Sequence, residues 1–305
     1  MNSEPSQRKS EKTALPAELH AATRRQHHAL NEQILLRLPL CLPPVVESPL
    51  VYAKGMVVFG QIYCAFEHVL AACANHGSLD PRLQEICRQV RLLHLLRTTH
   101  LEKDMGVLKS RLGFKATSEL DVLALESKVF HDRIISSLAA KPHAVLAYAW
   151  TMYLALFNGG RWIQRQLVSA GPGFWRGEDY PLSFWELDEG IVPAGAMRDL
   201  KATFKEALLV AASLPTDEEK DDIVEEATRL FDLCQEMVHF LDNKVTAAAT
   251  TTVPIEVSIT SYWIIQGFMG ATSLVLSVWR YMASTYTLLR TTARSVWDGR
   301  VVHVD

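Results

Sequence analysis

Three histidines on one predicted helix are the side chains best suited to holding a metal ion. The stretch "ELHAATRRQHHALNEQILLRL" contains His20, His27 and His28. At about 100° per residue, His27 borders an apolar stripe that includes Leu30, whereas His28 points toward solvent. His20 precedes His27 by seven residues and therefore shares its face. An imidazole beside an apolar stripe either ligates a metal or is a hydrogen-bonded core histidine, and the spacing alone favours the core histidine.

A pair of adjacent glycines is the second feature with chemical meaning. The stretch "YLALFNGGRWIQRQL", from Tyr153 to Leu167, has helical apolar spacing, yet Gly159 and Gly160 lie in its middle. Each glycine costs about 1 kcal/mol relative to alanine inside a helix. Either another helix crosses closely through Ala155 and Gly159, or a ligand approaches the backbone here. The sequence of this stretch leaves both explanations open.

The elements that carry these residues are predicted to be helices. Helical periodicity dominates the chain and alternating strand patterns are scarce, so the predicted fold class is all-α. The stretch "LPTDEE" is a capping box in which Thr216 and Glu219 bond each other's backbone amides. The expected helices span residues 16–38, 50–75, 81–111, 117–139, 143–169, 193–213 and 217–244.

Composition excludes several classes of protein. The chain has 305 residues, 49% of them hydrophobic, which is enough for a substantial core. A net charge of −3 argues against a surface for nucleic acid. Five cysteines without a C-x-x-C pair suggest reducing surroundings, with neither a disulfide framework nor a zinc knuckle. Residues 1–14 are polar and lack the apolar core of a secretory signal, so we expect a disordered tail.

The C-terminal region of the chain has a different texture. Small and polar residues over 245–256 predict a linker, and residues 280–305 form a basic tail. Between them, residues 257–279 are 23 residues without a charge. A helix of that length reaches about 34 Å, enough for a hydrocarbon core of about 30 Å. Aromatic residues near both ends favour a transmembrane anchor, whereas Gln266 and several Ser and Thr residues favour a buried helix.

Several motifs resemble those of one family, the haem oxygenases. "LHAATRRQHHALNE" is similar to the first helix of that family, where A-T-x-x-x-H supplies the proximal iron ligand, and His27 occupies that place. "YAKGMVVFGQIYCAFE", "LRTTHLEKDM" and "PHAVLAYAWTMYLALFNGG" resemble the second helix, a following segment and the distal helix. "LKATFKEAL" and "IVEEATRLF" resemble the helices that close the pocket. The motifs occur in the family's order, which implies a haem oxygenase-like helical domain over residues 15–244.

The resemblance implies a reaction and its requirements. Haem is both cofactor and substrate, and it is opened with O₂ to biliverdin, carbon monoxide and ferrous iron. His27 is expected to hold the iron, while Gly159 and Gly160 let the distal helix kink and bring its backbone against the haem. Electrons are expected to come from outside, because this chain shows no flavin- or nicotinamide-binding glycine fingerprint, and the family relies on a reductase that uses NADPH. The expected location is the cytosolic face of an intracellular membrane such as the endoplasmic reticulum.

The residues expected near the haem propionates differ from the family pattern. The resemblance places His20, Trp150, Lys201 and Lys205 where the family has a lysine, a tyrosine, a lysine and an arginine. Lys201 and Lys205 are one turn apart and share a face, which suits two carboxylates but also describes an ordinary solvated face. A lysine at the last position lacks the bidentate fork of arginine.

The distal aspartate of the family, which orders proton-delivering waters, is replaced by Leu156. A leucine cannot relay a proton, although Asn158 nearby can orient a water. This replacement leaves a haem carrier on the same fold as an alternative to an oxygenase. A non-haem di-iron oxidase is a lesser alternative. A di-iron site in a helical bundle normally has two Glu-x-x-His motifs, whereas this chain has one, at Glu236 and His239. A membrane-tethered interaction protein without a cofactor is the remaining alternative.

Overall fold

The computed structural model describes residues 14–75, 80–187 and 196–251, and these ranges contain helices and no strand. The predicted all-α class is therefore confirmed. Residues 1–247 form one compact unit, and residues 248–305 a second, of which only the end of the last helix is described. The predicted anchor over 257–279 and the polar tail over 1–13 lie outside the described residues. The first half of the chain forms α1 (Leu15–Arg37), η1 (Leu38–Cys41), α2 (Leu50–Asn75), α3 (Pro81–Val90), η2 (Leu93–Leu95), α4 (Thr98–Leu112) and α5 (Phe114–Ala140).

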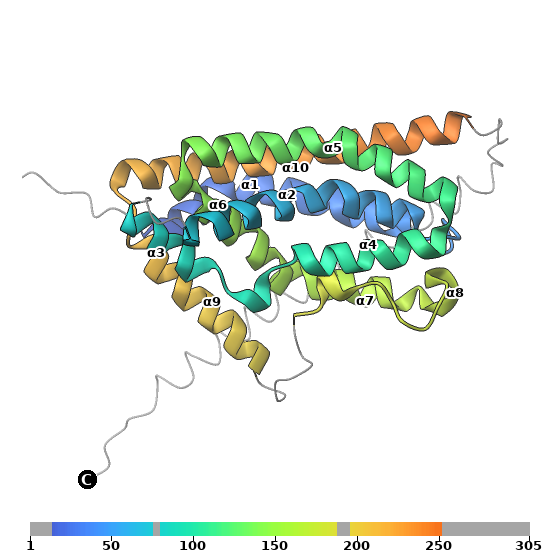
Figure 1. Cartoon of the computed structure of the whole chain (residues 1–305), viewed down its shortest axis with the longest axis horizontal. Helices are drawn as coiled ribbons and strands as arrows, with labels where there is room; N and C mark the ends of the chain where they lie inside the picture. The colour runs from blue at the N-terminus through green and yellow to red at the C-terminus, as the bar shows by residue number, and fades with distance from the viewer. Residues whose placement is uncertain (1–13, 76–79, 188–195, 252–305) are drawn as a thin grey trace, which may run out of the picture. The chain divides into compact units, whose positions relative to one another are not determined.

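The second half contains the segment with the glycine pair and, among the described residues, the four α-helices that follow it (Figure 1). Its elements are η3 (Pro142–Ala144), α6 (Val145–Tyr148), η4 (Ala149–Tyr153), η5 (Leu156–Gly160), α7 (Arg161–Ser169), α8 (Gly171–Trp175), η6 (Ser183–Trp185), α9 (Ala196–Ala212) and α10 (Asp217–Thr251). Helix α10 continues through residues 245–251, within the stretch expected to be a linker. Three consecutive alanines there, the best helix formers, account for the extension.

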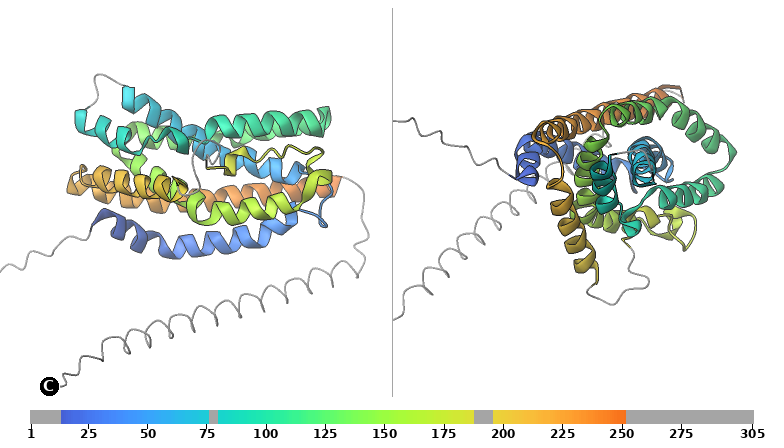
Figure 2. Two further views of the ribbon diagram at one scale, coloured as in Figure 1. Left: turned by 90° about the horizontal axis from the view of Figure 1, so that it is seen from below. Right: turned by 60° about the vertical axis from the view of Figure 1, so that its left-hand side comes forward.

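Helix α2 is the centre of the bundle. It contacts α3, α4, α5 and α6, and α4 and α5 surround it in the end-on view of Figure 2. Its side chains are apolar around most of its circumference, and Ala53, Val58, Ile62 and Phe66 are fully buried. Residues 50–74 are long and apolar enough to cross a membrane, but more than half of that window is buried inside the bundle. The core helix of a helical bundle can be equally long and apolar, so the length and hydropathy of α2 are weak evidence for a membrane span.

The sequence predicts one helix over residues 81–111, and this prediction is wrong. The structure has two α-helices, α3 and α4, joined by a short segment that contains the 3-10 helix η2. The cause is the fully buried Arg97, whose guanidinium donates to the carbonyl oxygens of His94 at 2.7 Å and Leu95 at 3.0 Å. It also donates to those of Phe184 at 3.2 Å and Glu186 at 2.5 Å. A continuous helix would use its carbonyls internally, whereas the break leaves them available to a buried charge.

The predicted capping box at the start of α10 is confirmed. Glu219 accepts from the Thr216 amide at 2.7 Å, and the Glu219 amide donates to Thr216 Oγ1 at 3.3 Å. Glu219 also binds the Arg82 guanidinium, with Nη2 donating to Oε1 at 2.9 Å. This pair holds the pKa of the Glu219 carboxyl down at about 2, because the arginine stabilises its charged form. The first turn of α10 is thereby fastened to α3.

Candidate functional site

The glycine pair lies in a segment whose helical winding changes twice. Residues 149–153 and 156–160 are π-helical, and regular α-helix resumes at Arg161. Single π-helical turns occur frequently at functional sites, because they redirect the backbone without ending the helix. We call residues 145–169 the distal segment. This segment departs from α-helical geometry at the two glycines. Such a departure is more typical of a functional site than of a regular helix.

The two glycines have different surroundings. A Cβ atom on Gly159 would meet nothing within 4 Å, and both Gly159 and Ala155 are exposed. A Cβ on Gly160 would lie 3.5 Å from the Trp185 ring, which is ordinary contact. No described residue of another helix lies within 4 Å of a Cβ built on Gly159, so the described helices do not supply a close crossing there. The backbone at Gly159 instead borders open space, as ligand approach requires.

Buried tyrosines fix the distal segment to the core. Tyr153 donates from its hydroxyl to Glu67 Oε1 at 3.0 Å, and Tyr63 donates to the Met152 carbonyl at 3.2 Å. Burial raises the pKa of the Tyr153 phenol well above its ordinary value, so it remains a hydrogen-bond donor. The Phe204 ring of α9 packs edge-on against Tyr153, with the ring centroids 5.6 Å apart. The buried contacts of Tyr153, Tyr63 and Phe204 therefore fix the backbone that carries the exposed Gly159.

Glu67 connects this segment to the break between α3 and α4. Its carboxylate accepts from the amides of Arg97 at 2.7 Å and Thr98 at 2.9 Å, and from Thr98 Oγ1 at 2.6 Å. Asp104 of α4 has a similar role, accepting from the amides of Ser183 at 3.0 Å and Phe184 at 2.8 Å. Burial raises the pKa of Asp104, and these donors oppose the shift. Sequence reasoning assigned no role to these buried charges, because periodicity does not separate a paired buried charge from an exposed one.

The three histidines of α1 occupy different surroundings. His27 is exposed, and its ring meets Phe231 of α10 edge-on, with centroids 6.0 Å apart. His28 has a side chain 68% exposed and lies 3.4 Å from Glu32 one turn later. His20 is exposed on α1. His27 thus has one side against an aromatic ring and the other open, whereas His28 belongs to the solvent face.

The remaining residues expected near haem are distributed over two elements. Lys201 of α9 donates from Nζ to Asn158 Oδ1 of the distal segment at 2.7 Å. Lys205, one turn further along α9, is exposed. Trp150 is half-buried and packs against the core. Helix α9 also contacts α1, so it lies beside both the histidine helix and the distal segment.

Leu156 and the Glu-x-x-His motif bear on the alternatives. Leu156 is 3% exposed and belongs to the apolar core, so it offers neither donor nor acceptor beside the glycines. Glu236 and His239 are both exposed, and Glu236 accepts from the Arg133 guanidinium. Within the described residues, no group of three or more His, Cys, Asp or Glu side chains is placed to hold a metal.

Haem fits the residues that are present. It needs one imidazole with an open side, a flat face of backbone without side chains, and cations or donors for its propionates. Among the described residues, His27 is the candidate for the first, Gly159 for the second, and Lys201 with Lys205 for the third. His27, Ala155, Asn158 and Gly159 are all exposed.

Fold and site together define a class: an all-α bundle whose first helix presents a histidine and whose distal segment is a glycine-containing, π-helical turn. The chain belongs to the haem oxygenase family. The family model described as Heme oxygenase matches residues 13–240, which covers most of the described bundle.

Two curated proteins are similar over a portion of their length. Heme-binding protein HMX1 of Saccharomyces cerevisiae is 26% identical over 162 residues, which are 50% of this chain and 50% of that protein. Heme oxygenase 2 of Synechocystis is 31% identical over 123 residues, 40% of this chain and 46% of that protein. The chain spans about half the length of the curated relatives it matches.

Solved structures share the fold at lower identity. The haem complex of heme oxygenase-1 from Synechocystis aligns with a TM-score of 0.58 and 20% identity, covering 78% of this chain and 97% of that one. Heme oxygenase 2 from Chlamydomonas reinhardtii, solved without haem, aligns with a TM-score of 0.60 and 20% identity, covering 74% and 97%. These likenesses establish the haem oxygenase fold.

Proposed function

We propose that the chain binds haem through His27 and opens it with O₂ and external electrons to biliverdin, carbon monoxide and ferrous iron. The observation that carries this proposal is the open backbone at Gly159, where a Cβ would meet nothing within 4 Å. Membership of the haem oxygenase family supports it. Haem, when bound, supplies the iron that activates O₂ and is itself the molecule that is cleaved.

Residues of α1 and α10 hold the proximal side in this proposal. The exposed His27 imidazole gives one ring nitrogen to the iron, and the Phe231 ring lies edge-on to it, with the ring centroids 6.0 Å apart. Leu19, Thr23 and Leu30, on the adjoining face of α1, are buried in the bundle. The ligand is thereby carried by a helix whose rotation is fixed by burial.

Residues of α9 bind the propionates. Lys201 donates to Asn158 at 2.7 Å, so a carboxylate that takes Lys201 releases the amide oxygen of Asn158. Lys205 lies one turn further along the same face and adds a second positive charge. His20 and the indole N–H of Trp150 are the further donors in the proposal. Propionate binding on α9 and rearrangement beside the glycines are therefore coupled through one hydrogen bond.

Proton delivery on the distal side rests on Asn158 in this proposal, because Leu156 cannot contribute. Asn158 is exposed next to Gly159, and its amide can both donate to and accept from a water. An amide can orient a water but cannot ionise, so it delivers protons less effectively than the carboxylate that the family has at the position of Leu156. We expect a slow enzyme.

A haem carrier is the second candidate function. The buried, apolar Leu156 favours it, since a protein that only binds haem needs no proton path. One relative is named as a heme-binding protein and another as a heme oxygenase, so the likeness supports either. In both cases His27 holds the iron and Gly159 borders the haem face.

One experiment separates the two candidates. Haemin is added to the full chain, followed by an NADPH-dependent flavoprotein reductase and air, while the absorption spectrum is recorded. An oxygenase loses its Soret band and forms a bilin, whereas a carrier keeps a stable Soret band. A chain that leaves the Soret band of free haemin unshifted would overturn both.

We also propose that residues 257–279 anchor the chain to an intracellular membrane, with the helical domain on the cytosolic side. Their lack of charge and aromatic flanks support this, and so does the need for a cytosolic electron source. The reductase is the expected protein partner.

A further inference from the structure

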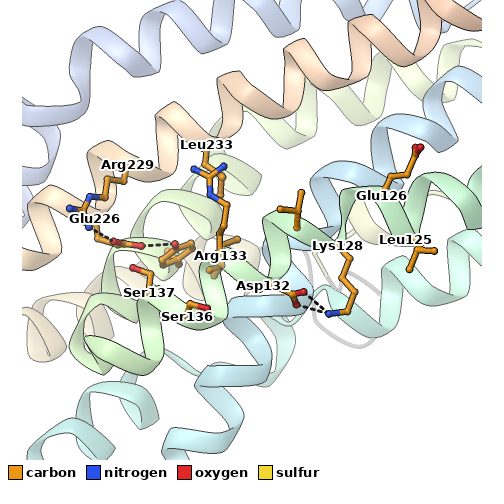
Figure 3. A pocket seen from close by; sticks show the side chains of 13 residues that line it. Leu125, Glu126, Lys128, Asp132, Arg133, Ser136, Ser137, Glu226, Arg229 and Leu233 are labelled. Atoms are coloured by element: carbon orange, nitrogen blue, oxygen red, sulfur yellow. Dashed lines mark hydrogen bonds and ion pairs between the residues drawn. The ribbon is translucent and has the colours of Figure 1, made fainter.

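A groove of about 670 Å³ lies between α5 and α10 and is lined by none of the residues assigned to haem. The two helices run alongside one another in Figure 1. In Figure 3, Glu226 and Arg229 of α10 lie at one end of the groove, and Leu125 and Glu126 of α5 lie at the other.

Glu226 is a buried carboxylate with one oxygen unsatisfied. The residue is 3% exposed, and the Tyr148 hydroxyl donates to its Oε1 at 2.7 Å. Its Oε2 is buried and has no hydrogen-bond partner among the described residues. The nearest cation, Arg229, has Nη1 at 3.8 Å from Oε2, and its Nη2 donates to Glu225 at 2.6 Å. Burying an ionised carboxylate without full hydrogen bonding is costly, so Oε2 is a place for a donor.

The other charges of the groove are already paired. Lys128 donates to Asp132 at 2.6 Å, and Arg133 donates to Glu236 at 3.2 Å across the groove. Glu126 accepts from Lys244 at 2.7 Å. Among the acids that line the groove, Glu226 is therefore the one held only by a long ion pair, with Arg229 at 3.8 Å.

The geometry points to a second binding site, in which Glu226 pairs with a primary ammonium group carried on a compact apolar body. The ammonium takes the place of the Arg229 guanidinium over Oε2. The Arg229 side chain is 56% exposed, so it can move outward while keeping Glu225 as its partner. The apolar side chain of Val129 lines the groove and is 53% exposed, so it provides contact for the body of the ligand.

Calorimetric titration of the full chain with phenethylammonium chloride tests this site. We expect saturable binding, weakened at least tenfold in Glu226→Gln, which keeps an acceptor for Tyr148 but removes the charge. Arg229→Gln should bind the probe more tightly, by about threefold or more, because it removes the competing guanidinium. The two substitutions therefore change affinity in opposite directions, which a general loss of structure does not produce.

Two controls define the chemistry. The neutral analogue 2-phenylethanol should not bind measurably, because it offers no charge to Glu226. Glu126→Gln removes a groove carboxylate that is already paired, and it should leave the affinity for phenethylammonium unchanged. Absence of binding to the unaltered chain, undiminished binding to Glu226→Gln, or equal binding of the alcohol would each overturn the proposal. Where Glu226→Gln does not fold, Arg229→Gln and the alcohol still decide.

Discussion

At the scale of single residues, His27 and His28 are neighbours in sequence with different surroundings. His27 meets Phe231 of α10, and His28 pairs with Glu32 on the solvent face. We therefore predict that His27→Ala abolishes the normal ferric haem spectrum and that His28→Ala leaves it nearly intact. Absorption spectra of both variants with haemin are the measurement, and the reverse result would mean that the ligand lies one residue later.

Leu156 carries the sharpest prediction about chemistry. Leu156→Asp supplies an acceptor able to order distal waters, and general acid–base assistance is typically worth about 10²–10⁴-fold in rate. The same change buries a polar group at a position 3% exposed, which costs on the order of 1–3 kcal/mol if unsatisfied. We expect faster bilin formation and a lower melting temperature.

The outcome of that comparison also identifies the proton path. If the unaltered chain already cleaves haem quickly, another residue organises the water, and Asn158 is the first to replace. If neither form cleaves haem while both bind it, the carrier function is the correct one.

At the scale of elements, Gly159 makes the distal segment less stable as a helix but leaves its backbone uncovered by a side chain. Gly159 is exposed, its φ is not positive, and a Cβ there meets nothing within 4 Å. Gly159→Ala should therefore leave the melting temperature unchanged or raise it, through a gain of up to about 1 kcal/mol. Haem affinity and turnover should fall in the same variant, because the methyl group occupies the face that haem needs.

Gly106→Ala is the matched control for that change. Gly106 is an exposed helical glycine of α4 where an added Cβ would meet nothing within 4 Å, and it lies outside the haem site. It should show the same stability gain without loss of haem binding. Equal haem affinity in Gly159→Ala and the unaltered chain would contradict the proposed face.

Local sequence is sufficient to predict most of the helices and to predict which face of α1 carries each histidine. Periodicity locates α1, α2 and α5 within a few residues, and the capping box locates the start of α10. The angle between successive residues separates His27 from His28 without reference to any tertiary contact. These features depend on residues within a few turns of one another, which is why sequence alone is enough.

The features that sequence does not reveal depend on distant contacts. The break between α3 and α4 exists because Arg97 reaches carbonyls of residues 184 and 186. The short elements α8 and η6 are also not expected from periodicity, and Asp104 holds the start of η6. The contact between Lys201 and Asn158 joins two elements through residues 43 positions apart. No local pattern records such partners.

At the scale of the whole molecule, the ion pair between Arg82 and Glu219 makes the free energy of unfolding depend on pH. The pKa of Glu219 is lowered from 4.5 to about 2 by Arg82, so its contribution is complete above pH 4.5 and is lost as the pH falls toward 2. After discounting for partial exposure, the pair contributes about 1–2 kcal/mol. Glu219→Gln should lower the free energy of unfolding at pH 7 and flatten its decline between those pH values. Urea unfolding at a series of pH values measures both.

The C-terminal segment leads to a prediction about fractionation. If residues 257–279 span a bilayer, the full chain should stay in the membrane pellet after alkaline carbonate treatment. Protease added to intact microsomes should digest residues 1–245. Arg280, Arg290, Arg294 and Arg300 follow the segment, and positive residues usually stay cytosolic, which opposes this orientation. Protection of the helical domain would reverse the orientation, and extraction by carbonate would remove the anchor.

Arg97 has a consequence for how the chain is made. Its carbonyl partners in residues 184 and 186 follow it by 87 and 89 residues. At the usual 5–20 residues per second, a ribosome needs about 4–18 s to deliver them after Arg97 has been added. During that interval a guanidinium destined for the interior has only its local carbonyls, and the half-made bundle cannot close over it. A nascent chain paused before residue 184 is therefore the form in which this protein is most exposed to proteases and chaperones.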